Sequence, residues 1–295
     1  MCLSDSCLFS FLDLYYTHRP RQAEYKGKEN FHMPNETTNK FSLVDLPEIP
    51  NSVDNAFQNL IDKPTKNIGE TFANIWFLVF GGLSQMADKK KMKYAMDLEQ
   101  YKLELEKSIS RIPADRKIEP SIQVTAQALE NSKYCIEEPE LRTMFSSLIS
   151  NSMNLDYLSD VHPSFAEMIK QMSPLDAQLL KIFKDGPPSG FPICDFHRKA
   201  DNGTYYVLAE NVFVEFQPEN PREVSRALTS LSRLGLLSLS QEVYLANDAL
   251  YKKFETCEFY KNFKDSFPSA NITIKKRKAT LTPLGNSFVK VCIPD

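Results

Sequence analysis

Apolar residues recur at helical spacing through the middle of the chain. Between residues 88 and 112 they are three or four positions apart without Gly or Pro, which places them on one face of a long helix. This face comprises Tyr94, Leu98, Tyr101, Leu105, Ile109 and Ile112. A second stripe after residue 137 comprises Leu141, Met144, Phe145, Leu148 and Ile149. Both stripes predict helices that bury one face in a core.

Three further helices are predicted beside these two. The first spans residues 120–134, with an inner side made of Ile122, Ala126, Leu129 and Lys133. A short helix follows His162 and Pro163, and we expect this isolated histidine to be a capping or structural residue rather than a catalyst. Ser173 and Pro174 open the next helix, because Ser accepts hydrogen bonds at the N-cap and Pro suits the first helical position.

The pattern changes after residue 173, where short strands join the helices. Pro221 follows the capping residue Asn220 and starts an amphipathic helix that Gly235 ends. Its apolar face comprises Val224, Leu228, Leu231 and Leu234. Strands are predicted at residues 236–240 and 272–281, and strand-like segments at 204–208 and 212–216. A capped helix followed by two strands is typical of a winged helix.

The two strands of this winged-helix pattern are separated by a long insert. A simple hairpin loop has two to five residues, whereas residues 241–271 lie between these strands. The insert predicts a helix of its own, with Leu250, Phe254, Cys257 and Tyr260 on one side. We therefore expect an elaborated winged-helix-like module.

These patterns predict a mainly α protein with a small β component. Residues 1–60 are polar and proline-containing and predict a disordered or extended tail. Residues 61–172 predict a helical domain, and residues 173–295 predict the winged-helix-like α+β domain. At 295 residues the chain is long enough for each part to bury a core.

Composition and motifs do not favour an enzyme. The net charge of -3 gives no general affinity for nucleic acid. The six cysteines form no C-x-x-C pair, and the four histidines lack the spacing of zinc ligands. None of the common nucleophile, metalloprotease or phosphate-loop motifs is present. We therefore predict no catalytic residues, no metal and no cofactor.

Seven basic residues of the C-terminal part are candidate contacts for nucleic acid or another partner. Three lie on the helix that starts at Pro221, and four form a run in the last predicted strand. They are Arg222, Arg226, Arg233, Lys275, Lys276, Arg277 and Lys278. The alternative is that the strand lysines are solvated and protect a sheet edge.

The apolar run at residues 71–83 contains the only tryptophan. It is shorter than the roughly 20 residues that a helix needs to cross a bilayer. A buried helix is the interpretation we favour. The alternative is an interfacial membrane anchor through Trp76, Phe77 and Phe80, because Lys89, Lys90 and Lys91 follow and can meet anionic lipid.

Several short motifs resemble the abortive-infection alpha family, a bacterial family long catalogued as a domain of unknown function. They are Glu138 to Arg142, Met144 and Phe145, Leu148 and Ile149, Val161 to Phe165, Ile169 to Gln171, and Ser173 to Ala177. The resemblance covers residues 64–180, and a winged-helix-like part is its usual continuation. It implies a cytoplasmic antiphage role in which infected cells stop growing or die, and it transfers no catalytic residues to this chain.

Three hypotheses follow. The preferred one is a non-enzymatic defence protein that recognises a protein partner of phage or host origin. The second is a DNA-binding regulator that uses the basic residues. The third is a membrane-associating toxic effector that acts through residues 71–83.

Overall fold

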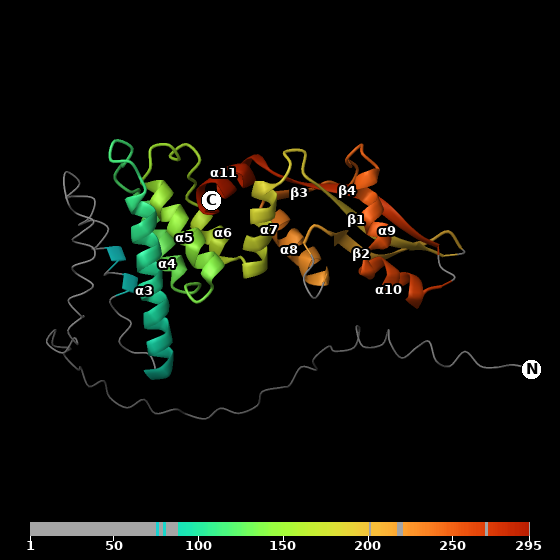
Figure 1. Cartoon of the computed structure of the whole chain (residues 1–295), viewed down its shortest axis with the longest axis horizontal. Coiled ribbons are helices and arrows are strands. Elements are labelled where there is room, and N and C mark those ends of the chain that lie inside the picture. Colours follow the sequence, from blue (N-terminus) through green and yellow to red (C-terminus); the bar gives the residue numbers. More distant parts are fainter. Residues whose placement is uncertain are drawn as a thin grey trace, which may run out of the picture. The chain divides into compact units, whose positions relative to one another are not determined.

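The computed structural model describes residues 75–76, 79–80, 88–200, 202–216, 221–268 and 271–294. The tail predicted for residues 1–60 lies outside this part of the chain, as do the predicted capping residue Asn220 and Phe77. The described residues are mainly helical and include a small antiparallel sheet, as the sequence predicts (Figure 1).

Between residues 88 and 172, which the structure describes without a gap, the helices are α3 (Asp88–Ser110), α4 (Ile122–Ser132), α5 (Pro139–Ser152) and α6 (Phe165–Lys170). The apolar stripe of α5 is buried as predicted, and α5 packs against α3, α4, α6 and α7 (Pro174–Asp185). On α3, Tyr101, Leu105 and Ile109 are buried, which confirms the stripe there. The centre of this part is therefore α5.

The buried face of α4 differs from the prediction. Ile122 is 63% exposed, whereas Val124, Ala128 and Leu129 are buried together with Thr125. The prediction placed Ile122 and Lys133 on the buried side of the helix. The observed stripe uses small and polar side chains that fit between packed helices, and a hydrophobicity pattern assigns such side chains to solvent.

A capping box starts α7. The backbone N–H of Asp176 donates to Ser173 Oγ at 3.3 Å, and the Ser173 N–H donates to Asp176 Oδ2 at 2.8 Å. Each residue thus satisfies a backbone donor that the helix leaves open. The predicted start at Ser173 and Pro174 is confirmed.

The sheet contains β1 (Phe191–Lys199), β2 (Tyr205–Val212), β3 (Leu237–Leu239) and β4 (Asn271–Leu281) in the order β2-β1-β4-β3. All neighbouring strands are antiparallel. The sequence did not predict β1, and the segments expected at 204–208 and 212–216 are instead one strand that ends at Val212. Strands β1 and β4 pair along most of their length and form the middle of the sheet.

The helices after residue 220 partly differ from the prediction: the first ends as predicted, and the other three do not match it. Helix α8 (Pro221–Arg233) ends before Gly235, whose φ of 75° is the left-handed conformation expected of a helix-ending glycine. The helix expected in the insert is two helices, α9 (Ala249–Thr256) and α10 (Glu258–Ser266), because Cys257 has an extended backbone. Helix α11 (Pro283–Cys292) was not predicted.

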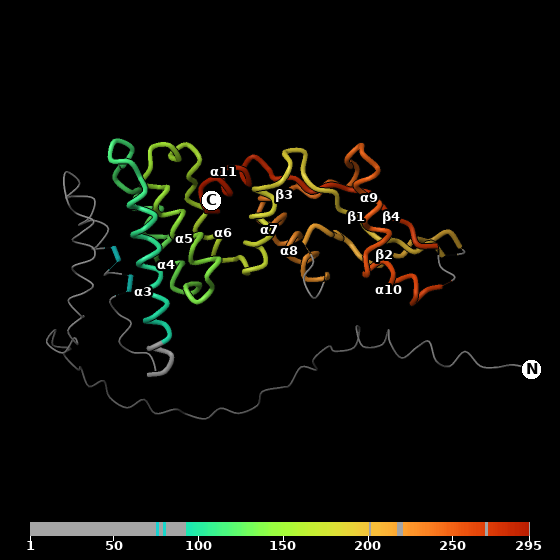
Figure 2. Tube along the Cα trace, viewed as in Figure 1, coloured from blue at the N-terminus to red at the C-terminus, as the bar shows by residue number. Residues whose placement is uncertain are grey.

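Helix α11 brings the end of the chain back to the first helices. It packs against α5 and α7 (Figure 2), and the rings of Phe165 and Phe288 meet edge to face at 5.0 Å. Asn151 Nδ2 donates to the carbonyl oxygen of Val291 at 2.8 Å. One hydrophobic cluster therefore contains residues from both sides of residue 173. The division into domains 61–172 and 173–295 stays a prediction.

A second, smaller hydrophobic cluster lies between the sheet and the insert. It is formed by Cys194, Phe196, Val212, Tyr251 and Phe254. The ring of Phe196 contacts Tyr260 and Phe263 of α10 at centroid distances of 5.3 and 6.1 Å. Helices α9 and α10 thus cover one face of the sheet.

Candidate partner-binding surface

Helix α8 presents two of the predicted arginines to solvent. Its apolar side, with Val224, Leu228 and Leu231, is buried against the sheet and α7. Arg222 and Arg226 are one turn apart on the exposed side, and the Arg226 guanidinium lies 3.7 Å from Glu223. Both arginines therefore lie at the surface of α8.

Arg233, the third arginine of α8, has a different environment. Both terminal nitrogens of its guanidinium donate to Gln171 Oε1 at 3.2 Å. Gln171 follows α6, so this pair of hydrogen bonds connects the end of α8 to the preceding helices. The contact gives Arg233 a positioning role within the fold.

The four basic residues of β4 do not form one patch. Successive side chains of a strand point to opposite faces, so Lys275 and Arg277 share one face of the sheet while Lys276 and Lys278 share the other. Lys276 Nζ lies 2.7 Å from Asp248 Oδ1 and 5.6 Å from the centre of the Tyr251 ring. The hydrogen bond to Asp248 raises the pKa of Lys276.

Arg277 departs from the predicted contact role because its side chain is buried. Only 2% of the residue is exposed, and its NH1 nitrogen lies 2.6 Å from Asp195 Oδ1 and 2.9 Å from Asn211 Oδ1. Its Nε donates to the carbonyl oxygen of Ser240 at 2.9 Å. The Arg277 side chain points into the core, so its positive charge is buried. The carboxylate of Asp195 compensates that charge.

Asn211 completes this polar network at an irregular point of β2. Its φ of 51° is left-handed, a conformation that Asn adopts more readily than most residues. The pairing of β1 with β2 shifts register between Cys194 and Phe196, and there the Asn211 N–H donates to Asp195 Oδ1 at 2.9 Å. The network thus joins β1, β2, β4 and the residue after β3. Asp195 and Asn211 were not predicted, although an aspartate inside the apolar segment 191–196 was a usable signal.

Three of the four described thiols are buried. Burial raises the pKa of Cys135, Cys194 and Cys292, which disfavours the thiolate that nucleophilic or metal-binding cysteines require. Within the part of the chain that the structure describes, no three His, Cys, Asp or Glu residues are grouped as metal ligands.

A model of the abortive infection alpha family matches residues 93–292. The chain belongs to the abortive infection alpha family. No curated protein and no solved structure matches it. The matched span is longer at its C-terminal end than the motifs at residues 64–180, and it includes the sheet, α8 and α11.

The candidate membrane residues of this abortive infection alpha protein precede the matched span. Trp76 and Phe80 are buried, with ring centroids 4.6 Å apart, and Trp76 lies 5.7 Å from the ring of Tyr101 on α3. This packing favours the buried-helix interpretation of residues 71–83. No helix among the described residues is both long and apolar enough to cross a membrane.

The histidine before α6 has a local role in this family member. His162 Nδ1 lies 2.7 Å from Ser164 Oγ and accepts from the Ser164 N–H at 3.2 Å. Its ring also lies 5.8 Å from that of Phe165. These contacts stabilise the turn before α6, whose N-cap is Ser164, and they fit the structural alternative for His162.

Proposed function

We propose that this protein defends a bacterial host against phage by recognising a partner during infection and then arresting growth of the host cell. The observation that carries the proposal is the family match over residues 93–292, which includes most of the described fold. The family name describes abortive infection, and abortive infection is a response of the cell rather than a metabolic reaction.

The protein is proposed to act without catalysis. Two observations support this part of the proposal. The buried thiols have raised pKa values, and the buried charges of Asp195 and Arg277 compensate each other instead of facing a substrate. Such groups stabilise a fold and leave recognition to surface side chains.

Recognition is assigned to the part of the chain after residue 173. Helices α7 and α8 pack together, and the β3–β4 pair follows α8, which supports a winged-helix-like module. The β1–β2 hairpin and the α9–α10 insert elaborate that module. In this proposal the exposed Arg222 and Arg226 of α8 contact the partner, and Arg233 holds α8 in place.

A phage challenge tests the proposal. Cells that express the protein should show fewer plaques for at least one phage of a diverse panel, and at high phage-to-cell ratios their culture should stop growing before progeny are released. The double variant Arg222→Glu/Arg226→Glu should lose this protection while it expresses at the normal level. Lys252→Glu, an exposed change on α9, is the control that should retain protection.

Phage mutants that escape protection identify the partner. Under the proposal they carry changes in one gene or in genes of one pathway, and the product of that gene restores toxicity when it is co-expressed with the defence protein. Normal plaque formation and normal cell growth across the panel, with the protein present at high level, would contradict a defence role.

A further inference from the structure

One face of the sheet is covered over only half of its length. Directly opposed residues of antiparallel strands point to the same face. Ile193, Arg277 and Ala279 therefore share a face, and this half is buried against the main core. Phe191, on the same face, meets the Phe183 ring of α7 at 5.1 Å.

No described element covers the other half of this face. The pairs Lys199 with Tyr205, His197 with Val207 and His197 with Thr273 place these side chains together, and Lys275 lies opposite Asp195. Tyr205 is 55% exposed and Val207 is 53% exposed, while Lys199 and Lys275 are also exposed. We call this set the open face: His197, Lys199, Tyr205, Val207, Thr273 and Lys275.

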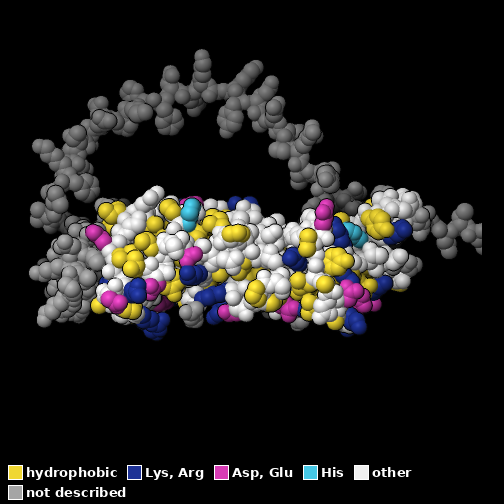
Figure 3. Space-filling view, turned by 90° about the horizontal axis from the view of Figure 1, so that it is seen from above, with side chains coloured by type: hydrophobic (Ala, Val, Ile, Leu, Met, Phe, Trp, Pro, Cys, Tyr) yellow, Lys and Arg dark blue, Asp and Glu magenta, His cyan; other side chains and the backbone are white. Residues whose placement is uncertain are grey.

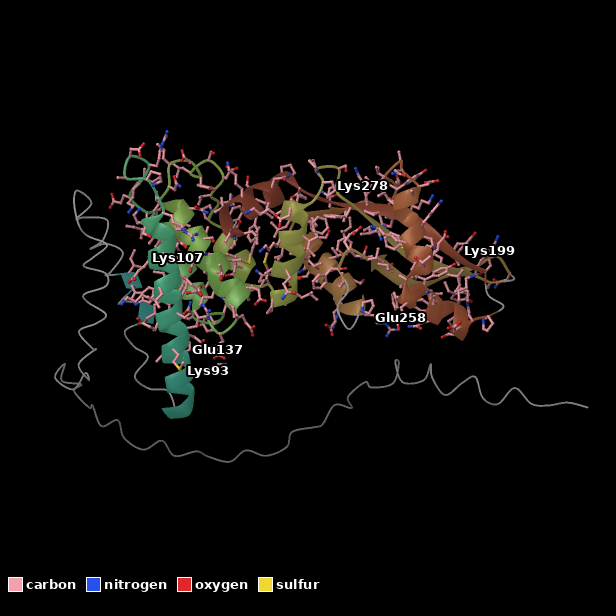
Figure 4. The ribbon with its side chains drawn as sticks, viewed as in Figure 1. Lys93, Lys107, Glu137, Lys199, Glu258 and Lys278 are labelled. Carbon is pink, nitrogen blue, oxygen red and sulfur yellow. The ribbon has the colours of Figure 1, made fainter. Side chains whose placement is uncertain are left out.

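The open face is basic. Strands β1, β2 and β4 contain two acidic residues, and neither leaves negative charge at this end of the sheet. Asp195 is neutralised by Arg277, and Glu210 lies beyond Ala209 along β2, away from the end where Tyr205 pairs with Lys199. Among the described residues, Lys199 and Lys275 form no ion pair and add positive charge to this face. Figure 4 shows Lys199 at the far end of the sheet from Lys278.

The open face also presents an aromatic ring at its edge, because Tyr205 is the first residue of the edge strand β2. Lys199 Nζ lies 5.7 Å from the centre of the Tyr205 ring, and the His197 ring lies 6.4 Å from it. These neighbours hold the tyrosine at the surface, with Val207 beside it. Figure 3 shows hydrophobic, basic and acidic side chains at this end of the molecule.

We propose that the open face binds single-stranded nucleic acid. Two lysines and an exposed aromatic ring on one face of a sheet match a strand of phosphates whose unpaired bases stack on the ring. Lys275 lies four residues along β4 from the partner of Lys199, which separates the two Cα positions by roughly 13 Å along the strands. This distance spans more than one phosphate of an extended strand.

A single strand fits this surface better than a duplex does. In a duplex the bases are stacked on each other, so they cannot lie on Tyr205 and Val207. The surface is also formed by strands and has no protruding helix for a major groove. Binding of single-stranded nucleic acid rests on the proposed defence function only for its biological role, because the binding is measured with purified protein.

Fluorescence anisotropy with the purified full chain tests the proposal. The probes are labelled oligo-uridine and oligo-thymidine of about 12 nucleotides, a length within the range of known single-strand sites, and a duplex of the same length. We expect at least one single strand to bind more tightly than the duplex, with affinity that falls steeply as salt rises. Preference for RNA or for DNA then specifies the strand.

Variants separate the charge from the ring. Lys199→Glu/Lys275→Glu should weaken binding about tenfold or more, because two phosphate contacts become repulsive. Tyr205→Ala should weaken it about fivefold or more through lost stacking, whereas Tyr205→Phe keeps the ring and should retain binding. The charge-matched control Lys107→Glu/Lys252→Glu changes exposed lysines of α3 and α9 and should bind as the wild type does.

Three results would overturn the proposal: no binding of either single strand, equal binding of duplex and single strand, or equal weakening by the control pair. Circular dichroism of each variant checks that its fold is intact. The two proposals can fail independently. A protein that does not bind oligonucleotides can still protect against phage, and a protein that does not protect can still bind oligonucleotides with a measurable affinity.

Discussion

Arg277 and Asp195 form an ion pair inside the sheet although 82 residues separate them in the chain. Both side chains are almost fully buried, and the carboxylate also accepts from the Asn211 N–H. The charges therefore lie in a polar network that three strands share. Removing one partner would leave the other buried without compensation.

Loss of one charge of this pair should destabilise the protein strongly. Arg277→Met is expected to lower the free energy of unfolding by about 3–5 kcal/mol, because Asp195 then stays buried without a counter-charge. Urea unfolding measures the change. Lys275→Met, on the same strand but exposed, should cost less than about 0.5 kcal/mol. The double variant Asp195→Leu/Arg277→Met should be more stable than Arg277→Met, and an equally stable pair would contradict the argument.

Truncation at the centre of α5 should be costly. Phe145 is fully buried, so Phe145→Ala is expected to lower the free energy of unfolding by about 3–5 kcal/mol through lost burial and a cavity. Met96 on α3 is 70% exposed, and Met96→Ala should change it by less than about 0.5 kcal/mol. Similar unfolding midpoints for the two variants would show that α5 is not the centre of the core.

A methyl group at residue 285 should separate α11 from the residue that precedes β3. A Cβ added to Gly285 would lie 2.1 Å from the carbonyl oxygen of Leu236, which is backbone and cannot rotate away. Gly285→Ala is therefore expected to cost about 1–3 kcal/mol, visible as a lower melting temperature. Asn286→Ala, exposed on the same turn, is the control. A higher melting temperature for Gly285→Ala would mean that the helix gains more than the contact loses.

Asp160 should contribute to acid sensitivity. Hydrogen bonds from Lys290 and Ser287 hold the pKa of its carboxyl below the ordinary value. A group with a lowered folded-state pKa stabilises the fold above its unfolded pKa, and this contribution is lost as pH falls through the folded value. Below about pH 4 the wild type should lose stability more steeply than Asp160→Asn. Urea midpoints from pH 7 to pH 3 measure this, with exposed Asp265→Asn as control, and parallel curves would refute the role.

Helices with large apolar side chains were predictable. In α5 and α3, aromatic and aliphatic residues at steps of three and four define a face that only a core can accept. The start of α7 was equally readable, since Ser173 and Asp176 act within one turn. Local patterns of this kind do not depend on the rest of the chain.

The sheet and the polar network were less predictable. Strand β1 contains Pro192 and Asp195, and both of its faces are buried over residues 192–196, so it lacks the alternation of a half-exposed strand. In α11 the cap at Thr282 was visible, but the helix is short, Gly285 lies in its first turn, and its partner α5 is distant in sequence. Arg277 can be buried because Asp195 compensates its charge. The two residues are far apart in the sequence, so the sequence alone does not show that they meet.

The docking of α11 onto α5 has a consequence during synthesis. The hydrogen bond from Asn151 to Val291 spans 140 residues, and a ribosome adds about 5–20 residues per second. The apolar surface of α5 that α11 covers is thus made roughly 7–30 seconds before its cover exists. That surface therefore stays open to contacts with other apolar segments of the nascent chain throughout this interval.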